Sequence, residues 1–95
     1  MDLHIKVEIT GTVQGVWFRK SAKQKADELG VFGYVENCTN GSVYIEAEGK
    51  IDRLEKLVQW CHDGPELAKV KDVVVLQYQD LKHYEEFEIR RPELY

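Results

Sequence analysis

The residues best suited to chemistry form one short stretch, residues 11–19, with the sequence GTVQGVWFR. Gly11 and Gly15 let the backbone turn tightly and bring its N–H groups close to a ligand. Arg19 adds a permanent positive charge on a planar fork that suits a phosphate or a carboxylate. The stretch therefore predicts a small anion-binding site. It is neither a Walker loop nor a dinucleotide motif, because the GxxxxGK[ST] and GxGxxG spacings are both absent.

These residues also have simpler interpretations. Arg19 can be read as a solvated arginine at the start of a helix, but the helix dipole disfavours a cation there, which favours a ligand. Asn37 shortly precedes the pair Asn40-Gly41, and on spacing alone it is better explained as a turn former. Ser42 either fixes the Asn37 amide or serves only the hairpin, and the sequence leaves both open.

The elements that must position these residues follow from the hydrophobic pattern. Alternating apolar residues predict strands, and apolar residues at helical spacing predict amphipathic helices. Phe18 lies on the apolar stripe of the first helix, so we expect Phe18 and its neighbour Trp17 to pack inside the protein rather than contact a ligand. The pattern predicts strands at residues 3–9, 31–38, 42–48, 70–78 and 87–89, helices at residues 20–29 and 51–61, and a turn at residues 80–83.

This order, β-α-β-β-α-β with a short extra strand, predicts an α+β fold. It is the split βαβ or ferredoxin-like arrangement, with two helices on one face of a four- or five-stranded, mostly antiparallel sheet. Asn40-Gly41 predicts a hairpin between the second and third strands. The fold alone does not decide the function, because many unrelated activities share it.

Composition narrows the function classes. The chain has 95 residues and a formal net charge of −4, which predicts one domain and argues against a general nucleic-acid surface. No apolar run approaches the ~20 residues of a membrane helix, and no signal-peptide core is present, so we expect a cytoplasmic protein. Cys38 and Cys61 are too few for a disulfide framework or a metal site. Free thiols are expected, although a single bridge between them stays open.

The histidines and most acidic residues show no functional pattern. His4, His62 and His83 are scattered without metal-ligand spacing, and we expect all three at the surface. We expect five acidic residues to lie in solvent, on an exposed strand face and in the tail: Glu46, Glu48, Glu85, Glu86 and Glu88.

Two segments resemble the signatures of a known family. The sequence GTVQGVWFR closely resembles the first acylphosphatase signature, GxVQGVxFR. Residues 33–49 resemble the second, of the form G-aromatic-V-x-N…G-x-V…G. Residues 64–70 are similar to the family's GPxxAxV connector, and residues 87–90 to its closing strand. The resemblance covers nearly the whole chain, which is therefore expected to be a single acylphosphatase-like domain over residues 1–95.

The resemblance implies a hydrolase that cleaves the carboxyl–phosphate bond of small acyl phosphates, giving a carboxylate and inorganic phosphate. It implies no metal or other cofactor, no nucleic-acid or membrane partner, a monomer, and inorganic phosphate as a product inhibitor. In the family pattern Asn37 positions the attacking water, and Arg19 binds the phosphoryl group. Backbone N–H groups of the loop assist Arg19, and the residues concerned are Gln14, Gly15, Val16, Trp17, Phe18 and Arg19.

Physical chemistry fits this reaction. The leaving carboxylate is a weak base, so catalysis needs positioning and charge stabilisation more than a strong acid. An asparagine amide both donates and accepts, so Asn37 can orient a water without ionising. Two residues depart from the family pattern: Trp17 stands where many members have glycine, and Glu36 where a basic or neutral residue is usual. Strand alternation should direct Glu36 away from Asn37.

Two other functions are weighed against the enzyme. One is a non-catalytic domain that uses the same loop to sense an anion or to contact a partner. The other is an RNA-binding domain, in which exposed aromatic residues such as Tyr34 and Tyr44 would stack on bases. The acidic neighbours Glu36, Glu46 and Glu48 argue against RNA.

Overall fold

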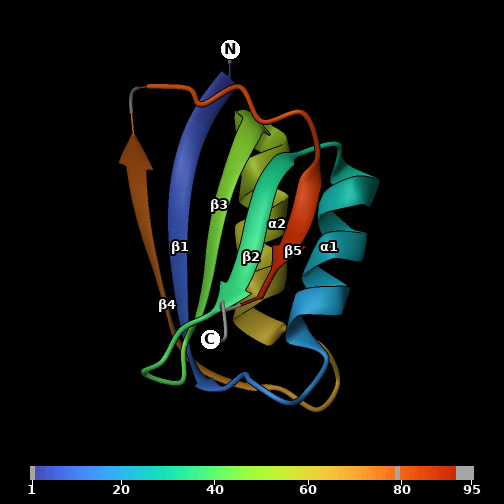
Figure 1. The fold of residues 1–95 in the computed structure, drawn as a ribbon, viewed down its shortest axis with the longest axis vertical. Coiled ribbons are helices and arrows are strands. Elements are labelled where there is room, and N and C mark those ends of the chain that lie inside the picture. The colour runs from blue at the N-terminus through green and yellow to red at the C-terminus, as the bar shows by residue number, and fades with distance from the viewer. Residues whose placement is uncertain (1, 79, 92–95) are drawn as a thin grey trace.

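The computed structural model, which describes residues 2–78 and 80–91, is a two-layer α+β fold (Figure 1). Five strands form one sheet in the order β4-β1-β3-β2-β5. All neighbouring strands are antiparallel except β2 and β5, which are parallel. The predicted ferredoxin-like arrangement is confirmed, with five strands. The elements are β1 (Asp2–Thr12), α1 (Phe18–Leu29), β2 (Phe32–Asn37), β3 (Val43–Lys50), α2 (Ile51–Asp63), β4 (Lys69–Tyr78) and β5 (Phe87–Arg90).

The strand directions bring distant residues to one end of the sheet. β3 lies between β1 and β2 and is antiparallel to both, so β1 and β2 run in the same direction. β5 is parallel to β2 and ends at the same edge. The loop of residues 13–17 after β1, Asn37 at the end of β2, and the end of β5 therefore lie at one end of the molecule (Figure 1).

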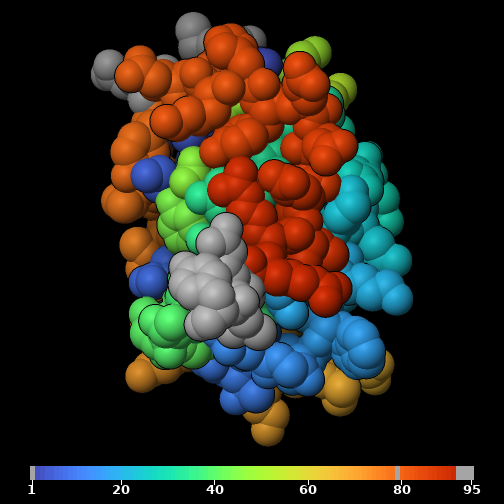
Figure 2. Space-filling view, viewed as in Figure 1, coloured from blue at the N-terminus to red at the C-terminus, as the bar shows by residue number. Residues whose placement is uncertain are grey.

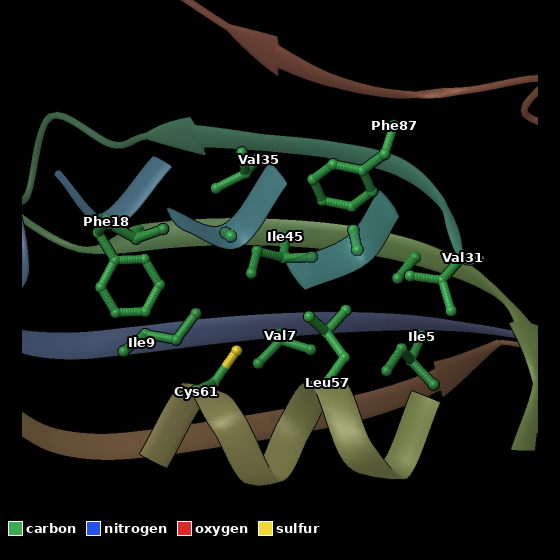
Figure 3. Packing of buried hydrophobic residues seen from close by; sticks show 14 of the residues in the cluster. Ile5, Val7, Ile9, Phe18, Val31, Val35, Ile45, Leu57, Cys61 and Phe87 are labelled. Carbon is green, nitrogen blue, oxygen red and sulfur yellow. The ribbon is translucent and has the colours of Figure 1, made fainter. Parts of the chain in front are cut away.

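Both helices cover the same face of the sheet and form the core with it (Figure 3). Alternate residues of β1 point to this face, and Val7 and Ile9 are fully buried. Burial of each such side chain contributes roughly 1.5–3 kcal/mol. Phe18, only 2% exposed, packs against Trp60 with ring centroids 5.2 Å apart, as predicted. Phe18 thereby fixes the first turn of α1 to the core.

The end of β1 is bent before the loop begins. Thr10 pairs with Asp72, but the next residue, Gly11, pairs with Val70, which marks a β-bulge. Gly11 has φ 125°, and a side chain there would collide with the carbonyl oxygen of Lys69. Glycine is therefore required where the chain leaves the sheet.

The face of the sheet away from the helices is partly covered, which contradicts three of the predictions. His4, Glu46 and Glu48 are at most 7% exposed, although we expected them at the surface. Glu48 accepts hydrogen bonds from the backbone N–H groups of Lys82 and Tyr84, in the connector between β4 and β5. Strand alternation correctly placed these side chains on the face of the sheet away from the helices, but it did not show that the connector between β4 and β5 crosses this face. The expected surface positions are confirmed for His62, His83, Glu85, Glu86 and Glu88.

Glu46 is the centre of a buried hydrogen-bond network. Its carboxylate accepts from the hydroxyls of Tyr34 at 2.7 Å, Tyr44 at 3.0 Å and Tyr84 at 3.2 Å. The His4 ring lies between two acceptors, with Nε2 2.7 Å from Glu46 and Nδ1 3.0 Å from the Asp80 carbonyl. The doubly protonated ring is the form that donates to both acceptors.

This network changes how its members ionise. Burial alone would raise the pKa of the Glu46 carboxyl, but the hydrogen bonds from Tyr34, His4 and Tyr44 outweigh it and lower that pKa. Burial, together with the bond to Glu46, raises the pKa of the Tyr34 and Tyr44 hydroxyls. Tyr34 is only 7% exposed, so it offers no free ring face for stacking on RNA.

Two further predictions concern the cysteines and the membrane. Cys38 and Cys61 are free, which confirms the expectation of unpaired thiols. Burial raises the pKa of the Cys61 thiol to about 12. None of the helices in the described part of the chain is long and apolar enough to cross a membrane.

We expect Glu46→Gln to lower the free energy of unfolding at pH 7 by about 2–4 kcal/mol, because the charge-assisted hydrogen bonds that the carboxylate accepts from Tyr34, Tyr44 and Tyr84 are weakened or lost. Since the folded-state pKa of Glu46 is depressed, its carboxylate stabilises the fold above the ordinary value of 4.5, and this contribution is lost as the pH falls below it. Urea unfolding should therefore show a smaller loss of stability between pH 5 and pH 3 in the variant. The exposed Glu85→Gln is the matched control, and equal acid sensitivity in the Glu46 variant and the parent would contradict this account.

Candidate active site

The loop between β1 and α1 enters the helix through left-handed backbone conformations. Gly15 has φ 74°, which glycine adopts without strain. Trp17, the N-cap of α1, has φ 67° and ψ 21°. A non-glycine residue in this conformation costs about 1–2 kcal/mol. The loop therefore turns sharply at both positions and leads directly into the first turn of α1.

The start of α1 presents unpaired donors. The first bond of the helix runs from the Ser21 N–H to the Trp17 carbonyl at 3.0 Å, so the N–H groups of residues 18–20 have no acceptor within the helix. The described residues offer them no other backbone acceptor. The Trp17 side chain makes no capping bond, and the first turn contains no acidic residue. Such a helix end favours an anion.

A cavity of about 510 Å³ adjoins this helix end. It brings Arg19, half-buried in α1, together with Asn37, half-buried at the end of β2. Among residues 2–78 and 80–91, those that line it include three cationic side chains and no carboxylate. Figure 2 shows the loop (blue) and the β2–β3 turn (green) reaching the surface at this end of the molecule. The lining residues are Val13, Gly15, Trp17, Phe18, Arg19, Lys20, Asn37, Ile89 and Arg91.

Arg19 is held beside β5. One of its terminal nitrogens, Nη1, donates to the Arg90 carbonyl at 3.4 Å. A guanidinium has five N–H donors, so this single long bond leaves others available for an anion. The same end of β5 contributes Ile89 and Arg91 to the cavity.

Gln14 connects the loop to the β2–β3 turn. Its side-chain amide donates to the carbonyls of Cys38 at 2.7 Å and Ser42 at 2.8 Å. Cys38 directly follows Asn37, so these two bonds fix the loop relative to Asn37. Gln14 itself does not line the cavity, and its role as a tie between two segments was not foreseen from the sequence.

Five of the seven predicted site residues line one cavity: Gly15, Trp17, Phe18, Arg19 and Asn37. Gln14 does not, and Val16 packs partly buried against the core. Four other lining residues were not predicted as site residues: Val13, Lys20, Ile89 and Arg91. Ile89 and Arg91 reach the cavity because β5 pairs in parallel with β2, which nothing in the sequence indicated.

The structure bears on three neighbouring side chains, Trp17, Ser42 and Glu36. Trp17 is 71% exposed, so the expectation that it packs inside the protein is wrong. It precedes the first helical residue and is therefore not on the apolar stripe that buries Phe18. Ser42 donates to the Asn40 side chain at 2.6 Å and to Glu8 at 3.4 Å, which supports the hairpin interpretation. Glu36 does not line the cavity, as strand alternation predicted.

Another cavity, of about 500 Å³, lies between α2 and β4. Its lining is mainly aliphatic and includes Ile51, Leu54 and Val75. It contains the carboxylate of Glu55 but no lysine or arginine, so it is poorly suited to an anion. The cavity of Arg19 and Asn37 is therefore the candidate site.

Known acylphosphatases are similar to this chain over most of its length. The acylphosphatase family model matches residues 5–89. A curated acylphosphatase of Methylococcus capsulatus is 40% identical over 87 residues, covering 92% of this chain and 95% of the relative. The acylphosphatase structure from Coxiella burnetii has a TM-score of 0.90 and 36% identity, with 94% of this chain and 93% of that chain covered. The one from Bacillus subtilis has a TM-score of 0.91 and 33% identity, with 93% and 98% covered.

We expect Gln14→Ala to lower the free energy of unfolding by about 1–3 kcal/mol, because two hydrogen bonds between the loop and the β2–β3 turn are lost, although each carbonyl keeps one backbone donor. Urea denaturation of the purified protein measures this change. The exposed Gln24→Ala on α1 removes the same atoms without breaking a tie between segments. A Gln14 variant as stable as the Gln24 variant would show that the two bonds do not hold the loop.

Proposed function

The chain belongs to the acylphosphatase family, enzymes that hydrolyse acyl phosphates, and we propose that this reaction takes place in the cavity shared by Arg19 and Asn37. The observation that carries the proposal is the meeting of these two side chains, from α1 and β2, in one cavity whose charged residues are all cationic. A phosphoryl group is the anionic part of the substrate, and this lining is complementary to it.

Arg19 is proposed to bind the phosphoryl group together with backbone N–H groups. Its guanidinium suits two oxygens of a phosphate, and each charge-assisted hydrogen bond contributes about 1.5–3 kcal/mol. The unpaired N–H groups of residues 18–20 add donors at the positive end of the helix dipole. These fixed donors stabilise the charge that spreads over the phosphoryl oxygens in the transition state.

Asn37 is proposed to orient the attacking water. Its amide oxygen accepts a hydrogen bond from the water, which directs a lone pair of the water oxygen toward phosphorus. The water oxygen forms a bond to phosphorus while the bond from phosphorus to the carboxyl oxygen breaks. The electron pair leaves with the carboxylate, and the proton of the water passes to the released phosphate or to solvent.

The proposal needs neither a covalent intermediate nor a strong acid. A carboxylate is a stable leaving group, so its departure requires little protonation. The residues given roles are Arg19, Asn37 and the loop amides, and no metal or other cofactor takes part in the proposed steps. A chelator in the assay buffer should therefore leave the rate unchanged.

The proposed enzyme acts as a monomer in the cytoplasm on small acyl phosphates. Inorganic phosphate, as the product, is expected to occupy the same donors and to inhibit competitively.

Arg19→Gln should lower kcat/KM for benzoyl phosphate by a factor of at least about 10²–10³, because the variant loses the charge that binds the transition state. Steady-state hydrolysis with a chelator present measures this loss, and inhibition by inorganic phosphate should weaken in parallel. Arg53→Gln, an exposed arginine on α2, is the matched control. A parental rate in the Arg19 variant would remove Arg19 from the mechanism. A parent protein that binds phosphate but leaves acyl phosphates intact would instead be an anion-sensing domain.

Asn37→Ala should lower kcat by about 10²-fold while the inhibition constant of inorganic phosphate changes little, because Asn37 is proposed to act on the water rather than to bind the phosphate. The exposed Thr39→Ala in the same turn controls for disturbance of the hairpin. Equal losses of turnover and phosphate affinity in the Asn37 variant would assign it to binding instead.

A further inference from the structure

Trp17 combines a strained backbone with an exposed aromatic side chain, and glycine would avoid both. Its backbone is left-handed, with φ 67°, a conformation in which glycine would be unstrained. Its side chain is 71% exposed, the highest value among the large hydrophobic residues described as exposed. A strained backbone position next to a functional cavity is a reason to look for a role.

Trp17 forms part of the lining of the candidate site. The side chain lines the same cavity as Arg19, beside the apolar residues Val13 and Ile89. The Lys20 ammonium lies 5.9 Å from the centre of the indole, within the range of a cation–π interaction that restrains the ring. Trp17 is thus an aromatic surface next to the groups proposed to bind the phosphoryl group.

The size of the cavity leaves room for more than phosphate. At about 510 Å³ it lies in the range of sites that enclose drug-sized ligands, which are usually lined by apolar and aromatic side chains. The cationic side chains account for the phosphoryl end of a substrate. The apolar side chains of the lining, above all Trp17, are therefore available to contact the acyl group.

We propose that Trp17 is a specificity-determining residue that stacks on the acyl group and selects acyl phosphates with a planar aromatic acyl group over those with a small aliphatic one. This inference rests on the proposed function of the cavity. An aromatic acyl group offers a flat face to the indole, and such pairs are favourable beyond the area they bury. An acetyl group is too small to cover the ring.

The test compares two substrates on each protein. The specificity ratio is kcat/KM for benzoyl phosphate divided by kcat/KM for acetyl phosphate, measured with the parent, Trp17→Gly and Trp17→Phe. Because both rates come from the same sample, the ratio does not depend on the fraction of protein that is folded. Phe32→Ala is the control: Phe32 is 42% exposed and lies at the end of β2 remote from Asn37.

The parent should prefer benzoyl phosphate, and Trp17→Gly should lower the ratio by about five- to tenfold. In Trp17→Phe the specificity ratio should stay close to that of the parent, since an aromatic ring remains at residue 17. Phe32→Ala should leave the specificity ratio unchanged. A ratio that stays the same in Trp17→Gly, with both substrates hydrolysed, would overturn the inference and leave the proposed function intact. Failure of the parent to hydrolyse either substrate would instead count against the proposed function.

Discussion

The two hydrogen bonds from the Gln14 amide are the interaction on which the geometry of the site depends. They join the loop after β1 to the turn after β2, at a place where β3 separates the two strands. The strand directions bring these segments to one end of the sheet, but strand pairing does not fix the distance between two loops. A single side chain with two N–H groups can bond to two carbonyls at once. Arg19 and Asn37 face one cavity because both flank segments that Gln14 ties together.

The opposite end of the sheet supports the site indirectly. Glu48 accepts the backbone N–H groups of Lys82 and Tyr84, and the His4 ring contacts the Asp80 carbonyl. These contacts hold the connector that leads from β4, at one edge of the sheet, to β5 at the other. β5 in turn delivers Ile89 and Arg91 to the cavity. Glu48 therefore has a structural role, because it satisfies backbone N–H groups of the connector. Glu46 adds a bond to the Tyr84 hydroxyl of the same connector.

The sequence was informative wherever the physics is local. Alternation and helical spacing gave the seven described elements within a few residues of their observed bounds, and the stretch that ends in Arg19 indicated where the candidate site lies. The order of elements gave the ferredoxin-like arrangement, because few topologies satisfy it.

The errors arose where a side chain depends on a segment remote in sequence. His4 and Glu46 follow the alternation of exposed residues, and only the path of the connector buries them. The role of Gln14 could not be predicted, because the carbonyls that its amide bonds to lie in a different turn, remote in sequence. Trp17 was predicted to pack because it adjoins Phe18, yet the helix begins one residue later and the left-handed backbone leaves its side chain outside.

The charge distribution is compatible with the proposed binding of an anion by an acidic protein. The formal net charge is −4, but the described residues that line the cavity include three cations and no carboxylate. Glu48 pairs with Phe32, five residues along β2 from Asn37, which places its backbone roughly 17 Å from the site end of the strand. At physiological ionic strength the Debye length is about 8 Å, so charges at that distance act weakly on a site open to solvent. Glu46 and Glu48 are, in addition, engaged by their own donors. Arg19, Lys20, Arg91 and the end of α1 are the charges at the cavity itself, and they favour the proposed binding of a phosphoryl group despite the negative charge of the chain.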